Sequence, residues 1–151
     1  MKRIKGGTKI VRGQLLENSY SATQNRIILF DGKFTTGYKV VKFTIAPEDP
    51  LTSKEIMSTL STEPDSGIRD WDWNDVKQFA WAGWGFNSST FTEPYELIDR
   101  DNVVVQDLWI NAATTGEAGN LNYYIELEKY EFTAWDGAAT LVRNQSQAGP
   151  E

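Results

Sequence analysis

The residues with the clearest potential for chemistry form one acidic, aromatic segment in the middle of the chain. Asp70, Asp72 and Asp75 lie within six residues of one another, and closely spaced carboxylates are typical of calcium loops. An EF-hand loop starting at Asp70 would need glycine at its sixth position and glutamate at its twelfth, where this chain has Asp75 and Trp81. Two interpretations stay open: a different oxygen-ligand site for calcium or magnesium, or a solvated turn in which Asp72 or Asp75 caps a short helix. We assign no metal and no cofactor to the chain.

The same segment is rich in tryptophan. Trp71, Trp73, Trp81 and Trp84 lie within fourteen residues, and flat rings beside Asp and Asn side chains suit a groove that stacks and hydrogen-bonds a sugar. Tryptophans also serve as bulk in a core or a subunit interface, because each one buries a large area. Both interpretations stay open, and we take the four tryptophans as candidate partner-binding residues.

No catalytic constellation is visible. The chain has no cysteine and no histidine, which excludes disulfides, thiolate zinc sites, cysteine nucleophiles and the serine-histidine-aspartate triad. Glu126 and Glu128 share one face of a predicted strand, as a glycosidase pair could, but Asn122 and Tyr124 on that face indicate its solvated side. We predict that the protein is not an enzyme and has no catalytic residue.

Charge is distributed unevenly along the chain. The net charge is −6, yet residues 1–45 contain nine Lys or Arg against two acids, whereas residues 46–151 contain six against nineteen. Either both sets are solvated faces of one domain, or a basic N-terminal arm docks on an anionic neighbour such as the acidic surface of another copy. The candidate partner-binding residues of this arm are Lys2, Arg3, Lys5, Lys9 and Arg12. The net negative charge would repel a duplex, so we predict no nucleic-acid partner.

The pattern of residues predicts one mostly β domain. Five segments rich in β-branched and aromatic residues read as strands: 9–16, 26–30, 34–45, 103–111 and 121–133. Asp31-Gly32 between two of them predicts a type I′ hairpin, and residues 78–86 are placed in the sheet as well. Gly37 predicts a bulge or a bend, and the change of apolar phase near Glu128-Lys129 predicts a bulge or a crossing of the strand from one face to another.

Helix is predicted to be scarce. Thr52 and Glu55 have the spacing of a capping box before Ile56, Met57 and Leu60, which predicts one or two turns, and residues 134–143 could extend either way. The fold class is therefore an antiparallel β-sandwich, or a jelly-roll-like fold, with one or two short helices. We divide the chain into one β domain over 1–143, with a basic arm at about 1–8, and a flexible polar tail over 144–151. No stretch approaches 18 consecutive apolar residues, so we predict no membrane partner.

A family resemblance is carried mainly by the C-terminal half. The run from Asn122 to Glu131 (NYYIELEKYE), the segment from Val142 to Gln147 (VRNQSQ) and the lack of cysteine and histidine resemble small virion structural proteins of marine tailed bacteriophages. The resemblance implies a β-sandwich or jelly-roll subunit in a virion, partnered by other virion subunits, with homo-oligomers expected. It favours a capsid or capsid-decorating role over a tail role. The alternative is a lectin-like module that binds a surface glycan through the tryptophans.

Overall fold

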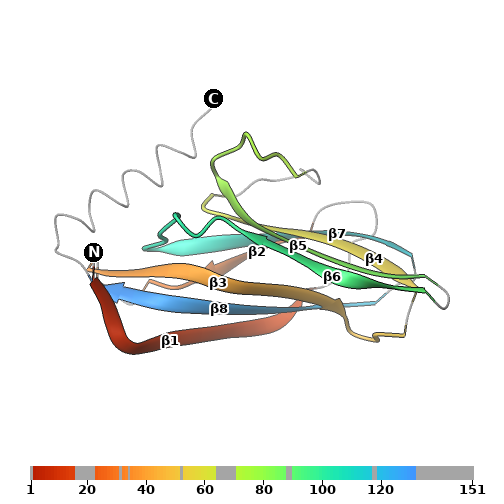
Figure 1. Cartoon of the computed structure of the whole chain (residues 1–151), viewed down its shortest axis with the longest axis horizontal. Helices are drawn as coiled ribbons and strands as arrows, with labels where there is room; N and C mark the ends of the chain where they lie inside the picture. Colours follow the sequence, from red (N-terminus) through yellow and green to blue (C-terminus); the bar gives the residue numbers. More distant parts are fainter. Residues whose placement is uncertain are drawn as a thin grey trace.

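The protein is a sandwich of two antiparallel β-sheets. The computed structural model describes residues 2–15, 23–30, 32–33, 35–51, 53–63, 71–87, 90–116 and 119–131. These residues form eight strands and no helix (Figure 1). The strands are β1 (Lys2–Leu15), β2 (Thr23–Ile28), β3 (Thr36–Pro47), β4 (Lys54–Ser61), β5 (Gln78–Asn87), β6 (Thr90–Ile98), β7 (Asp107–Gly116) and β8 (Leu121–Glu131). Within the described part, no helix is long and apolar enough to cross a membrane.

The strand order resembles that of a jelly roll, with β6 paired in the five-stranded sheet. A three-stranded sheet has the order β1-β8-β3, and a five-stranded sheet has the order β2-β7-β4-β5-β6. The pairs β1–β8, β2–β7 and β4–β5 are nested inside one another, as in a long antiparallel ribbon folded over on itself. The fourth nested pair, β3 and β6, meets along one side of the sandwich. The predicted β-sandwich is therefore confirmed.

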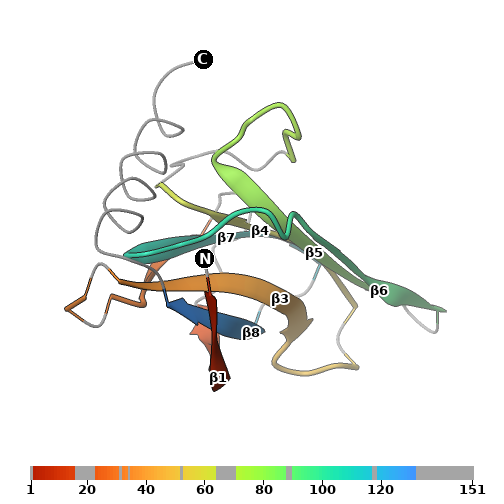
Figure 2. The same cartoon turned by 60° about the vertical axis from the view of Figure 1, so that its left-hand side comes forward.

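A side chain of β6 and the backbone of the segment that follows it cover the free edge of β3. The Phe43 backbone N–H donates to the Glu96 carboxylate of β6 (2.8 Å). Nearby, Tyr38 and Val104 exchange two backbone hydrogen bonds of 2.8 and 2.9 Å. These contacts satisfy backbone groups at an edge that would otherwise be free to pair with another strand. Figure 2 shows that β5 and β6 extend past the three-stranded sheet beyond this edge.

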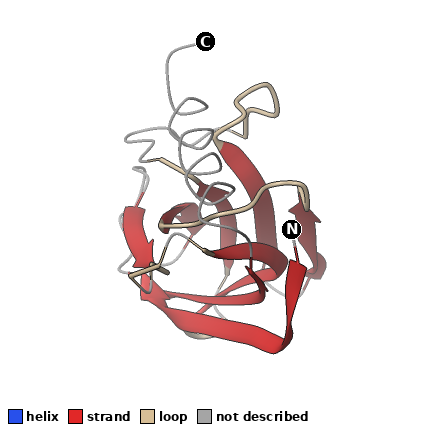
Figure 3. Cartoon of the chain, turned by 90° about the vertical axis from the view of Figure 1, so that its left-hand side faces the viewer, coloured by secondary structure: helices blue, strands red, loops and turns tan. Residues whose placement is uncertain are grey.

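The core lies between the two sheets. Alternating residues of each strand point inward, and the buried cluster joins Phe43, Ile45, Ile125 and Leu127 from the three-stranded sheet to side chains of the five-stranded one. The latter include Ile56, Leu60, Ala82, Leu108 and Ile110. The end-on view in Figure 3 shows the strands wrapping around this core.

The predicted helix at the Thr52–Glu55 capping box is wrong. Residues 54–61 form strand β4, which pairs with β5 on one side and β7 on the other. The apolar residues alternate with period two once Ser58 is counted among the inward positions: Ile56, Ser58 and Leu60 are buried, whereas Met57 is exposed. Two neighbouring strands therefore outweigh a local capping signal. The second possible helix, 134–143, lies outside the described residues, as does the tail at 144–151.

The predicted hairpin at Asp31-Gly32 is also wrong. β2 pairs with β7 and β3 pairs with β8, so the chain crosses from one sheet to the other between them. Gly32 has a positive φ of 89°, which suits a sharp change of direction as well as a hairpin. Ile27 and Leu29 are buried in the core, and this burial holds β2 in the five-stranded sheet.

The N-terminal residues are a strand where an arm was expected. β1 begins at Lys2 and pairs with β8, with an irregular register between Arg3 and Thr8. The irregularity lies opposite Lys129, where the phase change predicted a bulge, but the extra residues are on β1. The bulge predicted at Gly37 lies instead at Val41, because Gly37 keeps its pairing with β8.

Candidate functional site

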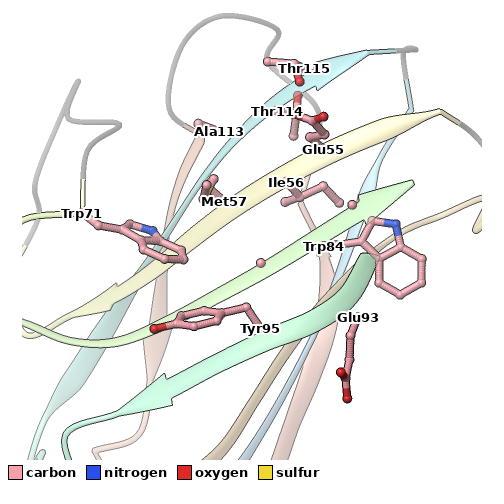
Figure 4. Close-up of a pocket in the computed structure, with 12 residues that line it drawn as sticks. Glu55, Ile56, Met57, Trp71, Trp84, Glu93, Tyr95, Ala113, Thr114 and Thr115 are labelled. Carbon is pink, nitrogen blue, oxygen red and sulfur yellow. The ribbon is translucent and has the colours of Figure 1, made fainter. Parts of the chain in front are cut away.

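A hollow opens on the outer face of the five-stranded sheet. Its volume is about 800 Å³. The pairing of β5, β4 and β7 puts Gly83, Met57 and Ala113 in one row across the sheet, and Gly85, Glu55 and Thr115 in the next. Glycine and alanine leave the sheet surface almost bare here, so the hollow results from missing side chains. Figure 4 shows Glu55, Thr114 and Thr115 at one end of the hollow, the pair Trp71 and Tyr95 at another, and Glu93 apart from the other polar residues.

The aromatic pair is Trp71 and Tyr95. Tyr95 lies on β6 beside Gly83, and its ring stacks on Trp71 with centroids 5.4 Å apart and planes at 26°. A Cβ built on Gly83 would lie 3.5 Å from Tyr95 Cβ and 3.9 Å from Trp71 Cη2. Gly83 therefore lies beside Tyr95 and close to the edge of the Trp71 ring, and Tyr95 remains 43% exposed.

A buried glutamine attaches the Trp71 loop to the sheet. The Gln78 Oε1 atom accepts hydrogen bonds from the backbone N–H of Asp72 (2.9 Å) and from Trp81 Nε1 (3.0 Å). Trp73 then packs edge-on against Trp81, with centroids 6.1 Å apart. One side chain thus sets the positions of the residues next to Trp71.

The acidic segment forms turns. The Asp72 carboxylate accepts from the Asn74 backbone N–H (3.0 Å), and the Asp75 carboxylate accepts from that of Lys77 (3.0 Å). These are the short-range bonds that Asp makes in turns, so they match the turn interpretation, without the short helix. Within the described residues no group of three or more acidic side chains could hold a metal ion. Asp70 lies outside those residues.

The four candidate tryptophans do not form one platform. Trp71 is a wall of the hollow, and Trp73 is 64% exposed. Trp81 is buried, with 6% of its surface exposed, and Trp84 packs against the core while touching the rim of the hollow. Tyr95 and Met57 were missed by the sequence analysis, because β6 was not predicted and Met57 was assigned to a helix.

The candidate basic residues belong to the other sheet. Arg12 is exposed on the outer face of the three-stranded sheet, and Lys9 Nζ lies 5.7 Å from the centre of the Tyr38 ring. Lys2, Arg3 and Lys5 lie on β1, and their side chains are outside the described part. The basic residues and the tryptophans are therefore on different layers of the sandwich.

The outer face of the three-stranded sheet is a mixed polar surface. The Tyr124 hydroxyl donates to the Glu126 carboxylate (2.8 Å), and Lys42 Nζ lies 5.7 Å from the centre of the Tyr124 ring. The hydrogen bond to Glu126 is the main cause that raises the pKa of Tyr124; desolvation and the carboxylate charge add to it, and Arg12 opposes it. A second hollow of about 460 Å³ lies on this face beside Arg12 and Tyr124.

Comparisons with known proteins give a likeness in structure and no match in sequence. No family model matches the chain, and no curated protein sequence matches it. Among solved structures, the chain is similar to one titled as the VP1 pentamer of human polyomavirus 7, with a TM-score of 0.49 and 8% identity. The match covers 87% of this chain and 99% of that one. At so low an identity the likeness assigns no role to any side chain.

Proposed function

We propose that this protein is a structural component of a virion, present in many copies, which acts by binding other subunits and not by catalysis. Within that class we favour a capsid or capsid-decorating protein of a bacteriophage over a tail component. The jelly-roll order of the strands supports the proposal, because viral capsid proteins are among the proteins that use this fold. A fold alone does not fix a function, so the proposal depends on the surface.

The observation that carries the proposal is an apolar surface around the hollow. Met57 is 52% exposed, Trp73 64%, Tyr95 43% and Leu97 40%. Tyr95 and Leu97 are on β6, next to Gly83 and Trp81 of β5, so these side chains border one region of the sheet. Exposed apolar clusters of this kind mark sites of protein association.

The test is the mass of the purified protein in solution. Light scattering at about 0.05 M and about 0.5 M salt covers a range in which exposed charge contacts become largely screened. We expect assemblies much larger than one chain at low salt, which shrink as salt is added. A monomer at every salt and protein concentration would contradict the proposal.

A second candidate, carbohydrate binding, is favoured by the stacked Trp71–Tyr95 pair. An exposed aromatic ring above a bare sheet surface, with Glu55 and Thr115 at the other end of the hollow, has the parts that a sugar site needs. Titration with a panel of glycans would quench tryptophan fluorescence in the wild-type protein and not in Trp71→Ala. The fluorescence of Trp81, which is buried, would stay unquenched in both proteins and would form the background signal.

A further inference from the structure

We infer that the hollow of one copy receives the outer face of the three-stranded sheet of a second copy, so that subunits join head to tail. This inference rests on the proposed multi-copy role and names the surfaces that carry it. Its first support is electrostatic, because the two layers of the sandwich differ in charge.

The five-stranded sheet presents carboxylates to a partner. Its strands contain two basic residues, Arg26 and Lys54. Arg26 donates to the Asp107 carboxylate (2.8 Å), and Lys54 is buried, with its Nζ donating to the Gly119 carbonyl (3.1 Å). Both cations are therefore occupied within the chain, whereas Glu55 and Glu93 line the hollow and are exposed.

The three-stranded sheet has more cations than carboxylates. Strands β1 and β3 contain seven basic residues and no acid, against three acids and one lysine on β8. On its outer face, Arg12 and Lys42 are exposed. Ile10, which shares the register row of Glu126 and Lys42, is 53% exposed. This apolar side chain, which has Arg12 and Lys42 as well as Glu126 around it, can pack into an apolar hollow whose border carries carboxylates.

The edges of β1, β3 and β6 are poor alternatives for assembly. β1 is an edge strand with five basic residues and an irregular register, β6 has Pro94 at a register shift, and β3 is covered by Val104 and Glu96. Charges, proline and irregular register are the devices that prevent strands from adding to an edge. Contact between faces is therefore favoured over addition of strands at these three edges.

Head-to-tail contact has a geometric consequence. The two surfaces belong to opposite layers of the sandwich, so a copy that uses its hollow still offers its basic face. Such heterologous contacts continue until they close a ring, and otherwise they extend as a filament. Assembly should therefore not stop at a dimer unless one of the two surfaces is removed.

Two double variants test the inference. Arg12→Glu with Lys42→Glu reverses the basic face, and Glu55→Lys with Glu93→Lys reverses the hollow. We expect each variant alone to have a dissociation constant about tenfold or more above that of the wild type at about 0.05 M salt. An equimolar mixture restores two attractive pairings, the native hollow with the native basic face and the lysine-bearing hollow with the glutamate-bearing face, so we expect the mixture to assemble again by sedimentation.

Controls separate the possible failures. Each variant must keep the circular dichroism and unfolding midpoint of the wild type, and Glu48→Lys with Asp101→Lys, two exposed sites outside the hollow, matches the charge change of the hollow variant. If both test variants assemble like the wild type, or their mixture assembles no better than either variant alone, the inference is overturned while multi-copy assembly stands. If the wild type is itself a monomer throughout, the proposed function fails as well. Glycan binding by that monomer would assign the hollow to a sugar.

Discussion

Replacing Gln78 by leucine should destabilise the fold and loosen the hollow together. The Gln78 side chain is buried, and its Oε1 atom accepts from the Asp72 backbone N–H and from Trp81 Nε1. Leucine fills a similar volume but cannot accept a hydrogen bond. A buried donor left without an acceptor costs about 1–3 kcal/mol. The Trp81 N–H is buried and should account for most of the loss of stability, whereas the Asp72 N–H is closer to water, which can replace the lost acceptor. We expect a total loss of about 2–4 kcal/mol.

Chemical denaturation followed by tryptophan fluorescence measures this loss. For a chain of this size, a loss of about 2–4 kcal/mol corresponds to a fall of about 5–15 °C in the midpoint of thermal unfolding. Gln14→Leu is the matched control, because Gln14 is exposed and donates to Asn122 at the surface (2.9 Å), so its loss should stay within about 0.5 kcal/mol. Assembly should weaken in the Gln78 variant below its melting transition, since the loop that holds Trp71 is detached. Equal stability of the two variants would refute this account of Gln78.

Three further results are expected. Gly116→Ala should lose about 2–4 kcal/mol of stability in a thermal melt, because Gly116 has a φ of 100° and a Cβ there would meet backbone of the strand beside it. The control is Gly83→Ala, whose added Cβ has no contact under 3.4 Å and whose loss should stay within about 1 kcal/mol. Equal losses of stability in the two variants would contradict this reasoning. Glu126→Gln should lower the pKa of Tyr124 toward its ordinary value of 10.0. Tyrosinate absorbance should then appear at a lower pH in a titration, and Tyr124→Phe should remove that signal. The hydrogen bond favours the neutral phenol, so its stabilisation is fully present below the ordinary pKa and is lost as the pH rises through the raised pKa of the folded protein. Trp71→Phe should retain assembly because it keeps an aromatic ring and removes a buried N–H without a hydrogen-bond partner in the described part of the chain, whereas Trp71→Ala should weaken assembly in light scattering.

The sequence predicted the strands that carry a strong local pattern. The segments 9–16, 26–30, 34–45, 103–111 and 121–133 all overlap strands of the structure, and 78–86 is β5. β-branched and aromatic residues between turn residues are enough to identify such strands. What the local pattern could not give was the pairing, because a hairpin signal at Gly32 reads the same whether the chain turns back or crosses to the other sheet.

Two strands were missed for different physical reasons. β4 contains polar residues at buried positions: Ser58 donates to the Asn111 carbonyl (2.7 Å) and Lys54 to that of Gly119. These partners are distant in sequence, so the burial of such residues could not be predicted from their types. β6 contains Glu93, Pro94 and Glu96, a composition that is typical of a loop. In the structure this segment is an edge strand, and Glu96 accepts a hydrogen bond from the Phe43 backbone N–H of β3.

The site was predicted in part. The tryptophan segment was singled out correctly as unusual, and Trp71 lies in the hollow. Its stacking partner Tyr95 belongs to the strand that was missed, and the hollow itself depends on Gly83 and Gly85 of β5 and Ala113 of β7, which lie on either side of β4. An empty space made by small residues from separate segments leaves no local signal in a sequence.

The charge asymmetry shows how a linear pattern becomes a spatial one. β1 and β3 both come from the basic N-terminal part of the chain, and the jelly-roll order places them in the same sheet with β8 between them. The five-stranded sheet takes its carboxylates from β4, β6 and β7 of the acidic part. A difference in charge between the two ends of the chain therefore becomes a difference in charge between the two layers. Residues 1–8 would not have contributed to this difference if they formed a separate arm. Because the layers face opposite directions, the same asymmetry that would make two identical faces repel one another lets unlike faces of successive copies attract.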